Sequence, residues 1–292
     1  MKIKDVICAV GRSGYMHRDL LAIKAGRAKP NGSLYDGAPM SPGFTRIIEP
    51  ATIISVMLVL EDGQVAFGDC ADVILAGVAG RDPAFDARHH IDYVRTEMAA
   101  ALRGRDVSEF RRHAEEMDRF EHAGKRLHTA IRYGVSQALL HASALAHKKT
   151  MAEVIAREYG SRIATAPIAI LASCHKDDPG QLDRVILKRV ELADIKRFAA
   201  AQASDFVQIK TPDLGSIHNT IEAVLYCKAN GMGACLGGTA NETDHSTRIS
   251  CHIGLACQPD FMLSKPGLGA DEALMIQTNE MARTLALLAA RR

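Results

Sequence analysis

The sequence predicts an α+β unit in residues 1–160 followed by an incomplete parallel (β/α) barrel in residues 161–292. In the first part, two apolar runs joined by Asp62 and Gly63 precede a long region of helical periodicity. In the second part, strand-like and helix-like segments alternate, and successive strands begin near Phe206, Gly233 and Phe261, 27 and 28 residues apart. This spacing is typical of a parallel (β/α) barrel.

The composition is that of an ordinary globular protein. The chain has 292 residues, of which 47% are hydrophobic and 24% charged, and its formal net charge is +2. Such a balance gives no electrostatic footprint for nucleic acid or an anionic membrane. The start, MKIKDVICAV, does not read as a signal peptide, and no apolar run is long enough to span a bilayer. We therefore expect a cytoplasmic protein. Seven cysteines without a CxxC pair are expected to be reduced, buried thiols.

The first elements are predicted to be a strand, a long loop and a hairpin. Lys4–Val10 is a short apolar strand, and the Gly- and Pro-rich stretch Gly11–Gly43 is expected to be a substrate-covering loop. Ile53–Leu60 and Gln64–Cys70 form the hairpin, because Asp62-Gly63 supplies the positive φ angles of a tight turn.

Helical periodicity then predicts four helices, at Pro83–Leu102, Ser108–Phe120, Leu127–His147 and Thr150–Tyr159. The last begins with a capping box formed by Thr150 and Glu153. Six histidines lie at helical positions without a second set of ligands, and packing or surface roles are expected for all of them: His89, His90, His113, His128, His141 and His147.

The second part predicts alternating strands and helices. The strands are Pro167–Leu171, Phe206–Lys210, Gly233–Gly238 and Phe261–Lys265, and the helices are Leu182–Leu192, Ser216–Ala229, Ser246–Cys257 and Asp271–Leu288. Beyond Thr165 there are 127 residues, the difference between 292 and 165. An eight-stranded barrel typically needs roughly 250 residues. The barrel is therefore expected to be incomplete and to expose strand edges.

Lys210 is a candidate proton-transfer base because it ends a strand of a βα unit, where such folds place their chemistry. The alternative, equally weighted on this segment alone, is a lysine whose stem packs while its amine reaches water. The carboxyl ends of parallel strands share one face, so Lys210, the turn Gly237–Thr239 and Lys265 are expected to converge. Paired glycines and helix-start amides in this turn suit a carboxylate, although a tight turn with an N-cap is the commoner role.

Five segments together resemble the 3-methylaspartate ammonia-lyase family of the enolase superfamily: FVQIKTPDLG, YCKANGMGACLGGTANET, LSKPGLGADEALMIQTNEM, LVLEDGQVAFGDCA and GKRLHTAIRYGVSQALL. The resemblance runs from Met1 to about Leu192 and resumes at about Ala193. It implies an α+β capping domain on a TIM-type barrel, and a lyase that interconverts threo-3-methylaspartate with mesaconate and ammonia in amino-acid catabolism. It also implies a small-molecule substrate, Mg²⁺ as cofactor with K⁺ as activator, and a homodimer.

The resemblance assigns roles to four residues. Lys210 matches the lysine that takes the proton, and Gln208 matches a glutamine that contacts substrate. Thr239 and Ala240 match a Thr-Cys pair that holds the second carboxylate, and alanine retains only the backbone part of that contact.

The family's three acidic metal ligands and its general-acid histidine would lie in βα units that are missing near Leu192/Ala193, so no metal ligand is assigned in this chain. Two candidates for replacing those ligands, Asp205 and Asp213, flank the strand of Lys210. Asp205 lies at its wrong end, and Asp213 is a single carboxylate, too few for a tight Mg²⁺ site. The others lie in helical sequence or in a loop cluster: Glu191, Asp194, His175, Asp177 and Asp178.

Two hypotheses follow. The chain is either an ammonia-lyase or a catalytically inactive remnant or interaction subunit of that family which lacks the metal site.

Overall fold

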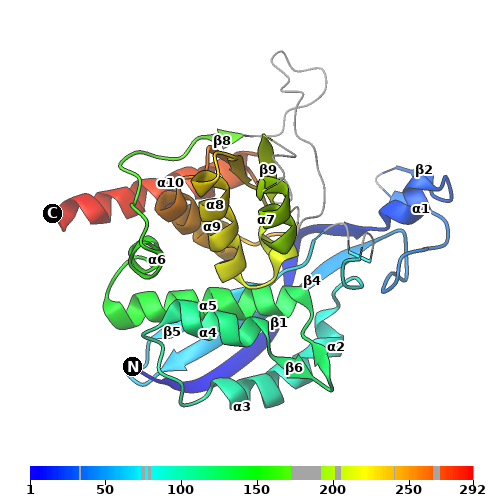
Figure 1. Cartoon of the computed structure of the whole chain (residues 1–292). Coiled ribbons are helices and arrows are strands. Elements are labelled where there is room, and N and C mark those ends of the chain that lie inside the picture. The colour runs from blue at the N-terminus through cyan, green and yellow to red at the C-terminus, as the bar shows by residue number, and fades with distance from the viewer. Residues whose placement is uncertain are drawn as a thin grey trace.

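The computed structural model describes residues 1–32, 34–73, 76–77, 80–171, 192–200, 205–239, 241–265 and 270–291. An antiparallel sheet and its helices lie at one side of the molecule, and a parallel sheet with helices lies against them (Figure 1). The N-terminal sheet, the helices that pack on it and the second sheet share one continuous apolar core. No described helix is long and apolar enough to cross a membrane.

The first sheet has the order β1-β4-β5, with β1 at Ile3–Arg18, β4 at Ile48–Leu60 and β5 at Val65–Cys70. The predicted hairpin is confirmed, and Gly63 adopts φ +85° at its turn. The predicted end of the first strand is wrong, because β1 continues eight residues beyond Val10. Since β4 begins at Ile48, it offers β1 a pairing partner as far as Arg18, across an irregularity between Arg12 and Met16.

The predicted loop Gly11–Gly43 is therefore only partly a loop. Beyond β1 it contains α1 at Leu20–Lys24, β2 at Lys29–Asn31 and β3 at Leu34–Asp36. This segment projects from the body of the molecule at the right of the view (Figure 1).

The predicted helices are found with shorter bounds. The first consists of α2 (Ala87–Tyr93), a π-helical stretch η1 (Val94–Met98) and α3 (Ala99–Leu102), followed by α4 (Phe110–Asp118), α5 (Thr129–His147) and α6 (Met151–Tyr159). The capping box of Thr150 and Glu153 is confirmed. A short hairpin of β6 (Glu121–His122) and β7 (Lys125–Arg126) separates α4 from α5.

Helix α5 lies directly on β5. A Cβ atom added to Gly134 would be 2.4 Å from the Cys70 nitrogen, and one added to Gly68 would be 2.1 Å from the Gly134 oxygen. Only glycine permits so close a backbone approach. This contact brings the side chains of α5 up to the edge of the second sheet.

The second sheet is parallel and has the order β8-β11-β10-β9. Its strands are β8 (Ile170–Leu171), β9 (Phe206–Ile209), β10 (Gly233–Leu236) and β11 (Phe261–Leu263). Pairing of the first strand with the last is how a barrel closes, and within the described residues the sheet has no further strand between β8 and β9. This agrees with the predicted incomplete barrel.

The helices that follow these strands are α7 (Leu192–Ala200), η2 (Thr211–Leu214), α8 (Ile217–Ala229), α9 (Asp244–Cys257) and α10 (Ala270–Ala290). The predicted helix Leu182–Leu192 lies outside the described residues except for Leu192, where α7 begins.

Candidate active site

The carboxyl ends of β9, β10 and β11 meet beside α5. Lys210 directly follows β9 and begins the turn η2. The Gly237 N–H donates to the Ile209 carbonyl at 2.8 Å, and the Lys265 amine donates to the Gly237 carbonyl at 3.1 Å. The predicted convergence of the strand ends is therefore found in the structure.

Lys210 is largely buried, and burial is the main cause that lowers the pKa of its ammonium. The Asp213 carboxylate opposes this shift, whereas the positive charges of Arg81 and Lys265 add to it. Its amine has no hydrogen-bond acceptor within the described part of the chain. A lysine with a depressed pKa and a free amine is suited to accept a proton, which favours the base over the solvent-reaching alternative.

Two other predicted substrate contacts lie at the ends of the same strands. The Gln208 side chain packs against Gly237, where an added Cβ would be 3.0 Å from the Gln208 Cγ. Its buried Oε1 has no hydrogen-bond partner among the described residues. Thr239 is 2% exposed, and its Oγ1 accepts from the Asn241 N–H at 3.5 Å. Ala240 lies outside the described residues.

A buried polar network fixes the base of the turn Gly237–Thr239. The carboxylate of Glu242 accepts from the hydroxyl groups of Tyr133 at 2.9 Å and of Thr211 at 2.7 Å, as well as from Ser246. The Lys265 amine lies 3.3 Å from the same carboxylate, and both side chains are 0% exposed. Burial alone would raise the pKa of Glu242, but Lys265 and the three hydroxyl groups together hold it below its ordinary value.

The sequence did not reveal this network. Glu242 lies within Gly237–Thr243, whose pattern predicts a tight turn with an N-cap, and Tyr133 follows the helical period of α5. The available signal was an acidic residue three positions after Thr239, together with a second lysine at a strand end, Lys265.

Side chains of the N-terminal part also reach the strand ends. Arg81 binds Asp213 in a bidentate pair, with Nε to Oδ1 at 2.8 Å and Nη2 to Oδ2 at 2.7 Å. Thr243 donates its hydroxyl to Asp69 of β5 at 2.6 Å. The N-terminal part therefore contacts residues that follow two of the strand ends.

Comparison with known proteins decides the family. Residues 1–160 match the family described as "Methylaspartate ammonia-lyase N-terminus", and residues 191–290 match "Methylaspartate ammonia-lyase C-terminus". The chain belongs to the methylaspartate ammonia-lyase family. The enzyme of that name from Clostridium tetanomorphum is 33% identical, and methylaspartate ammonia-lyase 2 of Carboxydothermus hydrogenoformans is 35% identical; the alignments cover 100% and 99% of both chains, respectively.

Solved structures agree. The magnesium complex of β-methylaspartase from Clostridium tetanomorphum has a TM-score of 0.92, covers 100% of both chains and is 33% identical. The Citrobacter amalonaticus enzyme containing (2S,3S)-3-methylaspartic acid also has a TM-score of 0.92, at 31% identity, and covers 99% of this chain and 100% of its own. Muconate lactonizing enzyme from Pseudomonas fluorescens, at 13% identity and TM-score 0.62, covers 92% of this chain and 89% of its own, and shares the fold.

The alignments are also longer than this chain. The Clostridium tetanomorphum alignment spans 414 positions, whereas this methylaspartate ammonia-lyase family member has 292 residues, a difference of 122. At least that many aligned positions therefore face no residue of this chain. This number of positions is consistent in size with several missing barrel units, such as those predicted to be absent near Leu192/Ala193.

The described residues do not offer a magnesium site. They contain no group of three or more His, Cys, Asp or Glu side chains that could hold a metal ion. Both oxygens of Asp213 are taken by Arg81, and Asp205 is exposed at the amino end of β9. The side chain of Asp194, on α7, is not described, and four candidates lie outside the described residues: His175, Asp177, Asp178 and Glu191. The described carboxylates do not fit Mg²⁺, which requires near-octahedral oxygen ligands.

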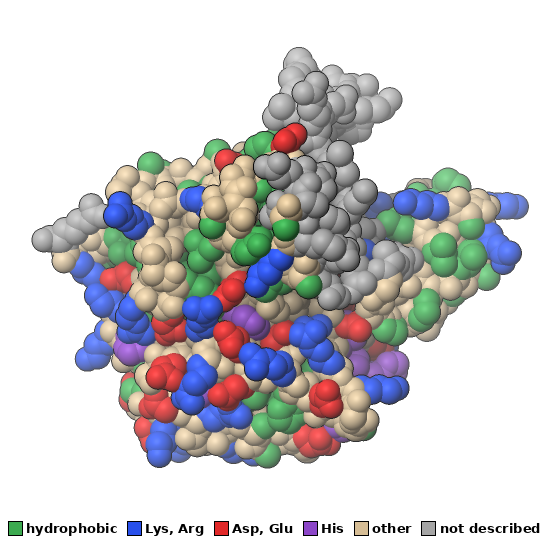
Figure 2. Space-filling view, viewed as in Figure 1, with side chains coloured by type: hydrophobic (Ala, Val, Ile, Leu, Met, Phe, Trp, Pro, Cys, Tyr) green, Lys and Arg blue, Asp and Glu red, His purple; other side chains and the backbone are tan. Residues whose placement is uncertain are grey.

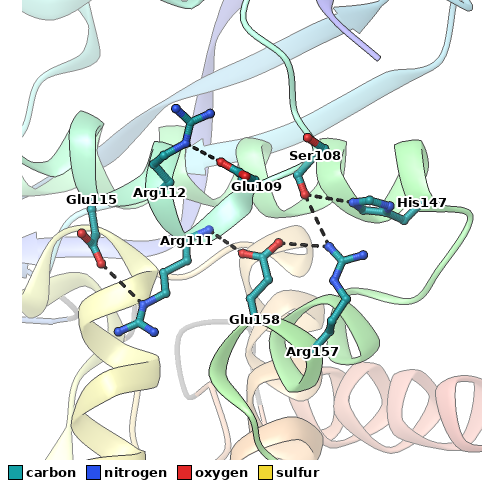
Figure 3. Close-up of a pocket in the computed structure, with 8 residues that line it drawn as sticks. All are labelled: Ser108, Glu109, Arg111, Arg112, Glu115, His147, Arg157 and Glu158. Atoms are coloured by element: carbon teal, nitrogen blue, oxygen red, sulfur yellow. Dashed lines mark hydrogen bonds and ion pairs between the residues drawn. The ribbon is translucent and has the colours of Figure 1, made fainter.

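A separate cleft of about 490 Å³ lies between α4 and α6 (Figure 3). Its charged side chains pair with one another, Arg111 with Glu115 at 3.5 Å and Arg157 with Glu158 at 3.1 Å. Glu158 also accepts the Arg111 N–H at the start of α4. Charged side chains of both signs are interspersed over this side of the molecule (Figure 2). Since its charges are already paired, this cleft offers no free group for a substrate anion.

Proposed function

We propose that this family member acts on 3-methylaspartate as an ammonia-lyase, with Lys210 as the proton-abstracting base. The single observation that carries the proposal is the largely buried amine of Lys210, which has no hydrogen-bond acceptor among the described residues, at the strand end that adjoins the turn Gly237–Thr239. Support for the substrate comes from the Citrobacter amalonaticus relative, whose structure contains (2S,3S)-3-methylaspartic acid.

In the proposed reaction, the neutral Lys210 amine takes the proton from the methyl-bearing carbon of the substrate. The electron pair of that C–H bond forms the carbon-carbon double bond of mesaconate, and the neighbouring C–N bond breaks to release ammonia. Gln208 contacts the substrate, and Thr239 together with the backbone of Ala240 holds its second carboxylate. Burial of Lys210 helps, because it disfavours the charged form that cannot accept a proton.

We propose Mg²⁺ as the cofactor of this reaction. One relative was solved as a magnesium complex, and Mg²⁺ with K⁺ is the cofactor pair implied by the family. The proposed reaction assigns no step to the metal, because the described residues contain no fitting set of ligands. A proton next to a carboxylate is only weakly acidic, so we expect turnover without a complete metal site to be very slow.

The test is an assay in which purified protein is mixed with 3-methylaspartate, Mg²⁺ and K⁺. Formation of mesaconate is measured by its ultraviolet absorbance. We expect slow conversion that Lys210→Ala abolishes and that Lys196→Ala, a change at an exposed lysine of α7, leaves unchanged. No mesaconate at high protein concentration would reject the ammonia-lyase and favour the remnant or interaction subunit.

We also propose that two copies associate. Within the described residues β9 is an edge strand, and its Phe206 side chain is 54% exposed. Open strand edges are templates for pairing with another chain. Analytical ultracentrifugation should therefore find a dimer, and a monomer at all concentrations would contradict this.

A further inference from the structure

The turn after β9 carries two opposite charges. Lys210 and Asp213 belong to the same turn, in which the Asp213 N–H donates to the Lys210 carbonyl at 3.1 Å. A nearby carboxylate stabilises the charged form of a lysine. Left alone, Asp213 would therefore favour the protonated form of Lys210, which is the wrong form for a base.

Arg81 binds the Asp213 carboxylate. Its Nε and Nη2 atoms bind both oxygens of Asp213, at 2.8 and 2.7 Å, and the two side chains are only 8% and 5% exposed. Bidentate arginine-carboxylate pairs are among the stronger and more directional ion pairs. Neither side chain has another hydrogen-bond or ion-pair partner in the described ranges of the chain.

We propose that Arg81 is a positioning residue, which holds the Asp213 carboxylate and thereby prevents it from pairing with the Lys210 ammonium. Arg81 comes from the segment between β5 and α2, so the N-terminal part of the chain controls the charge state of a group on the barrel. The proposal rests on the proposed function only in requiring a neutral amine, and it can be tested without turnover.

The other charges that act on Lys210 support this arrangement. Burial lowers the pKa of Lys210 most, Asp213 raises it, and Arg81 and then Lys265 lower it. The positive charge of Lys265 is itself paired with Glu242. Removing the Arg81 guanidinium would therefore both withdraw a positive charge and release a carboxylate, and both changes favour the ammonium form.

The experiment measures the reactivity of the Lys210 amine directly. Trace acetic anhydride acetylates only neutral amines, and peptide mass spectrometry gives the rate at each lysine across a pH series, with exposed Lys196 as internal reference. In Arg81→Met we expect Lys210 acetylation at neutral pH to fall about tenfold or more, because an unmasked carboxylate nearby shifts such an equilibrium by about one pH unit or more. In Arg81→Met/Asp213→Asn the rate should return to that of the parent protein.

A purely structural role for Arg81 gives a different pattern. An unchanged Lys210 rate in Arg81→Met, or a double variant slowed as much as the single one, would overturn the proposal. Should Arg81→Met not fold by circular dichroism, Asp213→Asn alone serves, for which the proposal expects the parental rate or a faster one; slower acetylation would overturn it. Absence of mesaconate would reject the ammonia-lyase function but would not change the acetylation rates. Failure of the proposed function and failure of the Arg81 proposal are therefore distinguishable.

Discussion

Replacing Lys265 by methionine tests the buried network most directly. Methionine keeps much of the volume of the lysine stem but removes the charge that lies 3.3 Å from Glu242. Lys265 packs so closely on the turn that a Cβ added to Gly238 would be 2.3 Å from its amine. After the substitution the Glu242 carboxylate remains buried, and among the described residues its side-chain partners are the hydroxyl groups of Tyr133, Thr211 and Ser246.

The size of the effect can be bounded from the protonation of Glu242. Breaking a buried ion pair by removing one partner costs about 3–5 kcal/mol. A buried carboxylate can instead take up a proton. From the ordinary value of 4.5 this costs about 1.4 kcal/mol per pH unit, or about 3.5 kcal/mol near neutral pH. We therefore expect Lys265→Met to lower the free energy of unfolding by about 3–4 kcal/mol near neutral pH.

The sign of the pH dependence follows from the same argument. In the parent protein the pKa of Glu242 is lowered, so its ionised form stabilises the fold at neutral pH. In Lys265→Met the folded-state pKa of this carboxyl is raised above its unfolded value. The folded variant then binds the extra proton, and its penalty relative to the parent shrinks as the pH falls towards the unfolded value.

Urea unfolding followed by circular dichroism between pH 5 and 8 measures this difference. Lys265→Met/Glu242→Gln is the control, because removing both charges leaves no carboxylate to protonate. We expect the double variant to be more stable than Lys265→Met at neutral pH and to lose the pH-dependent part of the penalty. A penalty that is equal at pH 5 and pH 8, or a double variant no more stable than the single one, would refute the reasoning.

Two further predictions concern the packing of α5. Gly134→Ala should destabilise the protein by about 1–3 kcal/mol or more, because the added Cβ meets the Cys70 backbone at 2.4 Å; Gly233→Ala, which meets only the movable Phe206 ring, should cost less in thermal unfolding. His141 accepts the Phe67 N–H at 3.1 Å, and its pKa is lowered to about 4, chiefly by burial. Since the unfolded chain binds this proton from about 6.5 downwards, up to about 2 kcal/mol of stability should be lost between pH 7 and 5. His141→Asn should lose less, and an equal loss in both proteins would contradict this assignment.

The sequence predicted the order of elements and the meeting of the strand ends because both follow from local patterns. Strand spacing and Gly-Pro turns are visible in a few consecutive residues, and parallel strands bring their carboxyl ends together by geometry. The length of β1 could not be predicted in this way. Its last residues pair with β4 some thirty positions away, and that non-local pairing outweighs the glycines in its sequence.

The polar network was missed for a related reason. Glu242, Tyr133 and Lys265 lie in three separate stretches of the chain, and each fits an ordinary local role on its own. The three residues are brought together by the tertiary fold. Helix α5 packs on β5 through glycines at close backbone contact, and this packing brings the Tyr133 hydroxyl to the Glu242 carboxylate. Burying a carboxylate costs free energy unless it is paired and hydrogen-bonded. Its partners come from distant segments that the tertiary fold brings together, so no periodic pattern in the sequence predicts them.

Arg81 and Tyr133 together indicate how the N-terminal part acts on the barrel. Arg81 binds the carboxylate in the same turn as the candidate base, and Tyr133 binds the Glu242 carboxylate at the base of the turn Gly237–Thr239. Both contacts cross from the N-terminal part to residues that follow barrel strands, and neither involves a residue assigned to substrate. A barrel segment separated from its N-terminal part would therefore keep Lys210 but lose the groups that pair with Asp213 and complete the shell around Glu242. Whatever chemistry remains in this shortened barrel thus depends on contacts outside it.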